Sequence, residues 1–436
     1  MFLLFDISDT AITKSKMLFQ LIITCIKFFP GICGRYQKNL ERCMLSAVVS
    51  KDPKISAAST SSFAWLPSCG SGGEKHVKHI EHWHNYMKKI LKTICVLCSD
   101  IINSNTANED SRSDELFSLP FQYNDSVSPG LLSLMHIQKL LALLESLLTK
   151  ATQYVVQVPL TLILSTFCEV INLLDIDFDK RSDFLSDFSF LKITLDKLFV
   201  TLMSCLEMTC KQFTVLMAPF TKVLCRSILN VLSWPHIQTK GSCFKAFTSC
   251  VEILLLSSDN CPMFMDVLNI VLDTIRVHIT AEQSVVLKEK PKGKKKNNPA
   301  KLFNSDIERA MNSNEWNEIA NSVVYDTKIA LLCLETIILS SGSLLVPEAV
   351  KSIIACLLKV YSDISLTRSK DKHIGQYTKQ NRYQFFKTLA VLIGLHHNKV
   401  QVPTSILLSI FRSTALNDNS VPISCLLYTS PSPRDS

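Results

Sequence analysis

The sequence predicts an all-α protein, a HEAT- or armadillo-like superhelix (solenoid) of stacked helix pairs. Three observations indicate this fold class. Apolar residues make up 47% of the 436 residues, which is enough for a large core. Only 11 glycines occur, too few for glycine-rich nucleotide folds or for the many tight turns of β-rich folds. Apolar residues recur with helical spacing throughout, and the alternation typical of strands is nearly absent.

The apolar periodicity predicts each helix in chain order, with lengths that exceed those of ordinary strands. Three helices follow a Val-Pro pair, in which proline presets the first helical φ without losing a needed hydrogen bond; these prolines are Pro159, Pro347 and Pro403. This recurrence predicts one helix-hairpin unit used repeatedly, as in irregular helical repeats. The predicted helices are 11–28, 36–50, 78–102, 130–150, 159–175, 188–208, 211–233, 243–257, 262–279, 322–340, 347–362, 382–396 and 403–415.

Polar stretches interrupt the helical pattern and predict linkers. Residues 103–129 are rich in Ser, Asn and Asp, and residues 281–317 predict a basic, disordered loop. A third stretch, 367–381, is basic and predicts a shorter loop. The two long linkers divide the chain into N-terminal, middle and C-terminal helical repeats at 1–102, 130–280 and 318–424.

The cysteines and the apolar runs indicate the cellular compartment and whether a membrane span is expected. The 16 cysteines are scattered singly through apolar segments, which predicts reduced core residues of a cytosolic or nuclear protein. The run 17–29 contains Gln20 and Lys27 and ends at Pro30, so it is too short for a membrane span and predicts a buried helix. We therefore expect no membrane partner. The formal net charge of +8 permits contact with RNA or acidic proteins without establishing it.

The most informative stretch is 26–91, where two sets of helix breakers separate apolar helices. Pro30 and Gly34 belong to the first set, and Pro67 and Gly70 belong to the second. A core alone does not require these stops. The stretch resembles the Rix-type pre-rRNA-processing factors, the family of the animal proline-, glutamic-acid- and leucine-rich nucleolar proteins. The residues that carry the resemblance are Phe29, Pro30, Cys33, Gly34, Leu40, Leu66, Pro67, Ser68, Gly70, Lys78, His79, Glu81 and Trp83.

The resemblance implies a non-catalytic scaffold subunit of a nuclear complex for 60S ribosomal subunit biogenesis. Such a protein would be located in the nucleolus and nucleoplasm and would assist processing of the spacer between the 5.8S and 28S rRNAs. Its implied partners are a WD-repeat subunit, a HEAT-repeat subunit, the midasin AAA ATPase, a SUMO protease and the pre-60S particle. An importin is expected for nuclear entry, a homodimer is left open, and no cofactor is expected.

The extent of the resemblance decreases away from this stretch. It covers most of residues 17–415, is weaker around 158–168, and is weakest elsewhere. The last residues, 425–436, look like the translation of a sequencing adaptor and are left out of the fold prediction. We expect the natural chain to continue beyond Ile423, where relatives carry a proline-rich, acidic tail.

A lysine run is the sharpest local signal for nuclear import. Pro291 and Gly293 prevent a stable helix there, so the ammonium groups are displayed on an extended segment that suits the acidic groove of an importin. Direct RNA contact and a merely solvated linker are the alternatives, and no aromatic residue is interleaved for base stacking. The import candidates are Lys288, Lys290, Lys292, Lys294, Lys295 and Lys296.

The segment 140–148 reads LLALLESLL and contains two overlapping LxxLL patterns. On a helix the leucines form one ridge that could enter a partner's groove, as in nuclear-receptor coregulators. The same spacing builds the core of a leucine-rich helical stack, and we favour that interpretation. The alternative functions are therefore a transcription coregulator and an importin-like transport adaptor. The LxxLL leucines are Leu140, Leu143, Leu144, Leu147 and Leu148.

The sequence gives only weak signals for a metal site, a nucleotide site or a catalytic site. A zinc site would need about four ligands, and the single CxxC pair of Cys95 and Cys98 has no second pair at a matching distance. The segment 69–75 reads CGSGGEK but lacks the GK[ST] ending of a phosphate loop. No catalytic motif stands out, so we expect no enzyme and no catalytic residue. The histidines that crowd the neighbouring helix start are His76, His79, His82 and His84.

Overall fold

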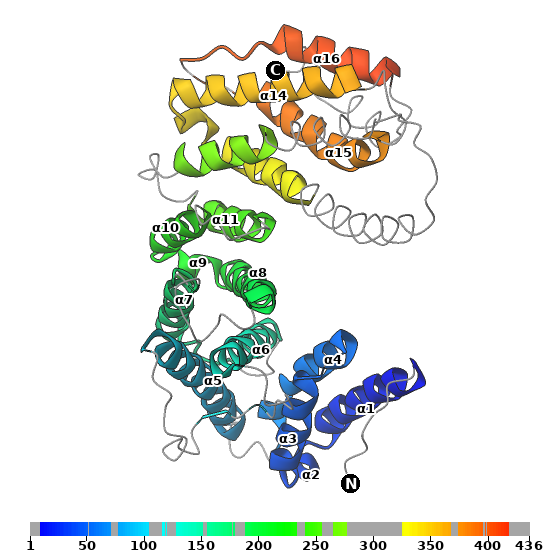
Figure 1. Ribbon diagram of the computed structural model, residues 1–436, viewed down its shortest axis with the longest axis vertical. Helices are drawn as coiled ribbons and strands as arrows, with labels where there is room; N and C mark the ends of the chain where they lie inside the picture. Colours follow the sequence, from blue (N-terminus) through cyan, green and yellow to red (C-terminus); the bar gives the residue numbers. More distant parts are fainter. Residues whose placement is uncertain are drawn as a thin grey trace, which may run out of the picture. The chain divides into compact units, whose positions relative to one another are not determined.

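The protein is helical in the part of the chain that the computed structural model describes, and no strand occurs in that part (Figure 1). The all-α prediction is therefore confirmed. The described residues are 9–50, 52–70, 77–103, 116–117, 119, 128–150, 155–176, 178, 188–232, 240–254, 265–276, 325–367, 374–395, 397 and 399–417.

The chain forms two compact units, which we call unit 1 (Met1–Phe213) and unit 2 (Thr214–Ser436). Their boundary falls inside the middle segment of the sequence-based division rather than at either end of it. Unit 1 contains α1 (Asp9–Phe28), α2 (Pro30–Gly34), α3 (Gln37–Val48), α4 (Pro53–Phe63), the 3-10 turn η1 (Leu66–Ser68), α5 (Val77–Asn103), α6 (Pro129–Thr149), α7 (Leu160–Leu174) and α8 (Phe188–Gln212).

Helices α5 to α8 form a four-helix group in unit 1 (Figure 1). Helix α6 packs against α5 and α8, and α7 also packs against α5 and α8, so each helix has two neighbours. Long apolar side chains at helical spacing fill the space between them, because this spacing puts them on one face. Examples that are fully buried are Met87, Ile90, Leu134, Phe167 and Leu202.

Helix α4 was not predicted, and its composition explains why. Its sequence PKISAASTSSF has almost no apolar period, so the pattern gave no signal. Asp52 caps it by accepting from the backbone N–H of Lys54 at 2.7 Å. The buried hydroxyls of Ser56 and Ser59 donate to the carbonyls of Val48 and Met44, both at 2.7 Å. These small polar residues satisfy backbone groups of α3 while α4 packs closely against it.

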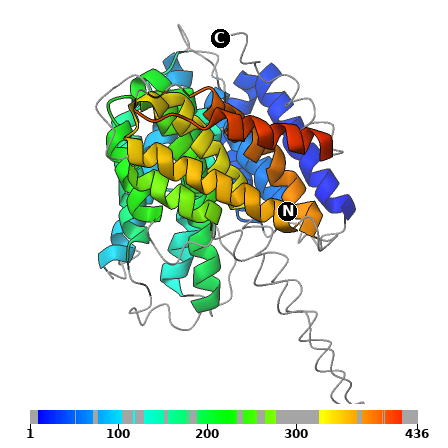
Figure 2. The same ribbon diagram turned by 90° about the horizontal axis from the view of Figure 1, so that it is seen from above.

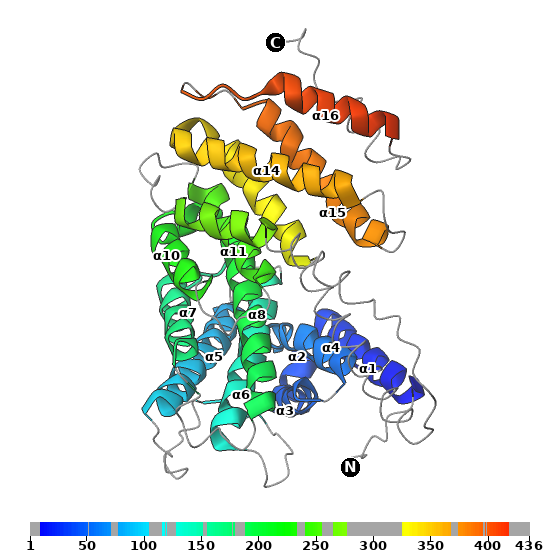
Figure 3. The same ribbon diagram turned by 45° about the horizontal axis from the view of Figure 1, so that its top comes forward.

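Unit 2 is also built from helix pairs. Helix α11 packs on α9 and α10, while α15 packs on α14 and α16 (Figure 3). Tyr361 Oη and Ser413 Oγ are 3.0 Å apart, so α14 and α16 lie side by side, as seen from above in Figure 2. The elements are α9 (Thr214–Met217), α10 (Thr221–Leu232), α11 (Gly241–Leu254), helical residues 265–276 and 325–341, η6 (Gly342–Leu344), α14 (Pro347–Thr367), α15 (Ile374–Ile393) and α16 (Thr404–Asn417).

Three predictions of element bounds were wrong. The single helix at 211–233 is divided into the end of α8, α9 and α10. Pro219 accounts for the break between α9 and α10, because proline cannot continue a helix. The loop at 367–381 ends earlier, since α15 begins at Ile374. Within the predicted linker 103–129, the side chains of Phe117 and Leu119 are buried, so part of this polar segment belongs to the core of unit 1.

Candidate functional site

The two sets of helix breakers meet in unit 1, where α2, η1 and α5 converge. We call this place the glycine junction and define it by Pro30, Gly34, Gly70 and His79. The backbone N–H of Gly70 donates to the carbonyl of Pro30 at 2.7 Å. A Cβ on Gly34 would lie 2.4 Å from the Cα of Gly70, which is far too close for a real contact. Two segments separated in sequence therefore touch backbone to backbone, and only glycine fits at position 34.

Gly70 has a second constraint, its own backbone conformation. Its φ is +107°, a backbone conformation that residues other than glycine rarely adopt. The Nε2 of His79, on the first turns of α5, lies 3.3 Å from the carbonyl oxygen of Gly70. Both backbone polar groups of Gly70 thus contact another segment, Pro30 on one side and α5 on the other. The junction ties three elements through one residue.

The remaining residues of the resemblance divide into buried and exposed sets. Leu66, Pro67 and Trp83 are buried, so they anchor η1 and α5 in the core. Phe29, Lys78 and Glu81 are exposed. Cys33, Leu40, Ser68 and His79 are partly buried.

Trp65, next to η1, holds a pair of lysines that the sequence did not suggest. Lys150 Nζ lies 3.4 Å from the centroid of the Trp65 ring, and Lys27 Nζ lies 4.4 Å from it. Lys150 also donates to the carbonyl of Ala64 at 2.9 Å. These contacts join the end of α6 to α1 and η1. Nothing in the local sequence links Lys150 to a tryptophan so distant along the chain, so only the folded structure reveals the cluster.

The charges of Lys150 and Lys27 disfavour each other in this cluster because both ammonium groups lie near the Trp65 ring. Burial lowers the pKa of the Lys150 ammonium; Cys69 opposes this shift and the nearby Lys27 charge adds to it, and together they leave the pKa at about 7. The face of the Trp65 ring attracts the charged form and opposes this effect. Burial raises the pKa of the adjacent Cys69 thiol to about 12, with a contribution from Cys33. Cys69 is thus a neutral thiol at physiological pH and a poor nucleophile.

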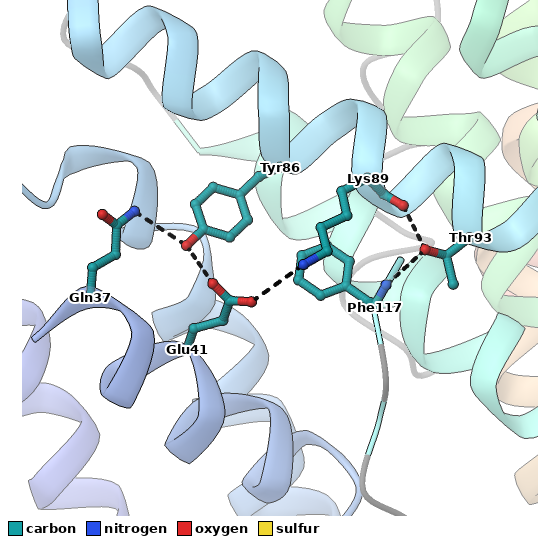
Figure 4. A network of polar contacts seen from close by, with 6 residues as sticks. All are labelled: Gln37, Glu41, Tyr86, Lys89, Thr93 and Phe117. Carbon is teal, nitrogen blue, oxygen red and sulfur yellow. Dashed lines mark hydrogen bonds and ion pairs between the residues drawn. The ribbon is translucent and has the colours of Figure 1, made fainter. Parts of the chain in front are cut away.

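A separate polar network lies between helices of unit 1 (Figure 4). The hydroxyl of Tyr86 donates to Glu41 Oε2 at 2.9 Å, and Lys89 Nζ lies 3.9 Å from Glu41 Oε1. Burial, followed by the Glu41 charge, raises the pKa of Tyr86. Phe117 donates its backbone N–H to Thr93 Oγ1 at 3.1 Å, and its ring lies 4.4 Å from Lys89 Nζ. The network connects α3, α5 and the segment around Phe117.

All five LxxLL leucines on α6 are buried inside unit 1. The polar positions between them also have partners. Glu145 Oε1 accepts from Ser204 of α8 at 2.9 Å, and Ser146 donates to the carbonyl of Thr60 in α4 at 3.0 Å. In this structure α6 packs on α4, α5 and α8, so the leucine ridge forms core contacts and is not displayed.

Two of the sequence-based candidates lie outside the described residues. These are the lysine run at 288–296, with its import candidates, and His76. Most of the glycine-rich segment 69–75 also lies outside them. The first residues of that segment, Cys69 and Gly70, belong to the glycine junction.

The described residues also bear on metal binding and on membrane spans. Among the described residues, no group of three or more His, Cys, Asp or Glu side chains could hold a metal ion. Cys95 Sγ lies 3.4 Å from Thr166 Oγ1, and the cysteines in the described ranges are free thiols, most of them buried. Two described helices, 129–149 and 325–344, are long and apolar enough to cross a membrane, but about half or more of each is buried within the protein, as in core helices.

The arrangement at the junction serves to fix segments rather than to activate a group. Its close contacts are a backbone hydrogen bond, a glycine–glycine approach and the contact of His79 with Gly70. The neighbouring cation–π contacts at Trp65 join α1 and the end of α6 to η1. No protein-family model matches the chain, and no curated protein is similar to it.

Proposed function

We propose that this protein is a non-catalytic scaffold subunit of a nuclear complex that assembles the 60S ribosomal subunit and processes pre-rRNA. The proposed architecture is a HEAT- or armadillo-like superhelix of helix pairs. Its partners would be the WD-repeat and HEAT-repeat subunits of a Rix-type complex, midasin, a SUMO protease and the pre-60S particle. The mechanism is passive, because a stack of helix pairs offers extended surfaces to several partners at once.

One observation carries the proposal. Four residues of the family resemblance, which come from three separate stretches of sequence, meet at the glycine junction: Pro30, Gly34, Gly70 and His79. Residues that are shared because of one structural requirement are expected to lie together. The contact between Gly34 and Gly70 supplies that requirement, since any side chain at position 34 would separate the two segments.

The test is depletion of the protein followed by analysis of pre-rRNA. We expect accumulation of precursors that retain the spacer between the 5.8S and 28S rRNAs, together with loss of free 60S subunits. Re-expression of the full chain should restore both. Purification of the tagged chain should recover pre-60S proteins. Normal spacer processing after depletion, or recovery of Ran and transport cargo in place of pre-60S proteins, would contradict the proposal and favour a transport adaptor.

The coregulator alternative makes a different prediction for α6. If the LxxLL leucines bound a receptor, Leu143→Ala with Leu144→Ala would abolish receptor binding and leave the fold intact. Both side chains are fully buried, so we expect the change to destabilise unit 1 by about 2–5 kcal/mol per leucine. Thermal unfolding followed by circular dichroism distinguishes the two outcomes. An unchanged melting temperature would favour the coregulator.

A further inference from the structure

Among the described residues, an exposed apolar surface lies on the first two helices of unit 1. Phe28 is 71% exposed, Met17 67% and Ile32 62%. On α1 the exposed apolar residues recur at helical spacing, opposite the buried Phe19 and Ile26 that hold α1 on the unit. We define the α1–α2 apolar surface by Met17, Leu21, Phe28, Phe29, Ile32 and Tyr36, all of which are exposed.

The charged residues in the segment that carries this surface have one sign. Between residues 16 and 38, all of which the structure describes, every charged side chain is Lys or Arg, and no Asp or Glu occurs. Lys16 and Lys27 lie about three turns apart on α1 and on the same side of the apolar stripe. Arg35 and Lys38 follow α2, and all four cations are exposed. A partner therefore gains apolar burial at the centre and charge attraction at the edge.

We propose that the α1–α2 apolar surface binds an amphipathic helical segment of another protein, one that combines Leu, Met or aromatic anchors with Asp and Glu. The stripe along α1 matches a helix that presents anchors at i, i+3 or i+4, and i+7. Carboxylates beside those anchors would lie near Lys16, Lys27, Arg35 and Lys38. This binding mode does not depend on which assembly the protein serves, because it follows from the surface alone.

A second copy of the chain fits this surface poorly. Face-to-face pairing of two identical surfaces would bring both sets of cations together with no carboxylate between them, and like charges at an interface are unfavourable. The composition also favours a protein partner over a lipid surface. Met, Phe, Tyr and Arg are the residues enriched in protein interfaces. The surface further changes direction at Phe29, between α1 and α2, whereas a membrane favours apolar groups at one depth.

The test selects binders from a display library of random 16-residue peptides against the full chain. We expect enriched peptides to carry Leu, Met or Phe at helical spacing with an excess of Asp and Glu. The affinity of the best peptide is then measured by fluorescence anisotropy. The double variant Phe28→Ser/Ile32→Ser should weaken binding at least tenfold, because both side chains are anchors. Lys16→Glu/Arg35→Glu should also weaken it, by several-fold at low salt and by less at high salt.

The matched control is Val215→Ser in unit 2, a valine that is 76% exposed and lies outside the surface. It should leave peptide binding unchanged. Since all substituted side chains are exposed, we expect each variant to keep the circular dichroism spectrum and melting temperature of the parent. The following results would overturn the proposal: no enriched peptides, peptides without acidic residues, equal binding by Phe28→Ser/Ile32→Ser, a dimer that this double variant dissociates, or binding to phosphatidylserine vesicles that it abolishes.

Discussion

In unit 1, Gly34 lies against the backbone of another segment, whereas in unit 2 Gly241 and Gly342 lie against side chains. A Cβ on Gly34 would meet the Cα of Gly70 at 2.4 Å. A Cβ on Gly241 would meet Asp326 Oδ1 and Tyr325 Cε1 at 2.7 Å, and one on Gly342 would meet a methyl group of Leu395 at 2.4 Å. Side chains can rotate away from a new methyl group, but a backbone held by hydrogen bonds at both of its polar groups cannot.

The two kinds of contact constrain the sequence to different degrees. Where two backbones touch, as at Gly34, the position accepts glycine alone. Where a backbone meets a side chain, many pairs of residues fill the space equally well. The contacts in unit 2 do not fix residue identities in this way, although they also join segments distant in sequence. Asp326, for example, contacts the backbone at the start of α11.

The largest expected effect is at the backbone contact. Gly34→Ala should destabilise unit 1 by about 3 kcal/mol or more, because the new methyl group must separate α2 from Gly70. Gly31→Ala on the same helix is the matched control, since a Cβ there meets nothing within 4 Å. It should be neutral or slightly stabilising, as expected of alanine in a helix. Urea unfolding measures both, and equal stability of the two variants would refute the backbone contact.

The unit 2 counterpart is the carboxylate of Asp326. Its two oxygens accept from the backbone N–H groups of Gly241 at 2.7 Å and Lys240 at 3.0 Å, so it caps α11 from another helix. Asp326→Ala should cost about 2 kcal/mol by leaving both donors unpaired. Asp326→Asn keeps one acceptor and should cost less. Faster amide hydrogen exchange at the start of α11, with no change in unit 1, is the expected signature. Equal exchange in all three proteins would exclude the cap.

A third prediction uses pH to test the lysine pair at Trp65. The folded pKa of Lys150 is about 7, below the unfolded value of 10.5. Between these values the unfolded state binds the extra proton, so stability should rise with pH from about 7. The slope should be up to about 1.4 kcal/mol per pH unit. Lys150→Met should lack this slope between pH 7 and 8.5, where Cys69 and Cys33 remain protonated. Parallel stability curves would show that Lys150 titrates normally.

The sequence predicted the helical class and most helix positions because apolar spacing reports directly on which faces are buried. It also located the stops at Pro30 and Gly70, since proline and glycine have local conformational consequences. It missed α4, whose packing depends on serine hydroxyls instead of an apolar stripe. The contact of Lys150 with Trp65 and Ala64 could not be predicted either, because it joins segments far apart in sequence with no shared pattern.

The smallest expected effect separates the two constraints at the glycine junction. Gly70→Ala introduces a methyl group that would meet only His82 Cε1 at 3.9 Å, so its cost comes from the backbone conformation at φ +107° and not from a clash. We expect about 1–2 kcal/mol of destabilisation. Gly394→Ala in unit 2, which has ordinary contacts and no positive φ, should cost nothing comparable. Thermal unfolding of the two variants measures the difference. If Gly70→Ala were as harmful as Gly34→Ala, the clash and the conformation could not be separate constraints, and the contrast between the units would lose its physical basis.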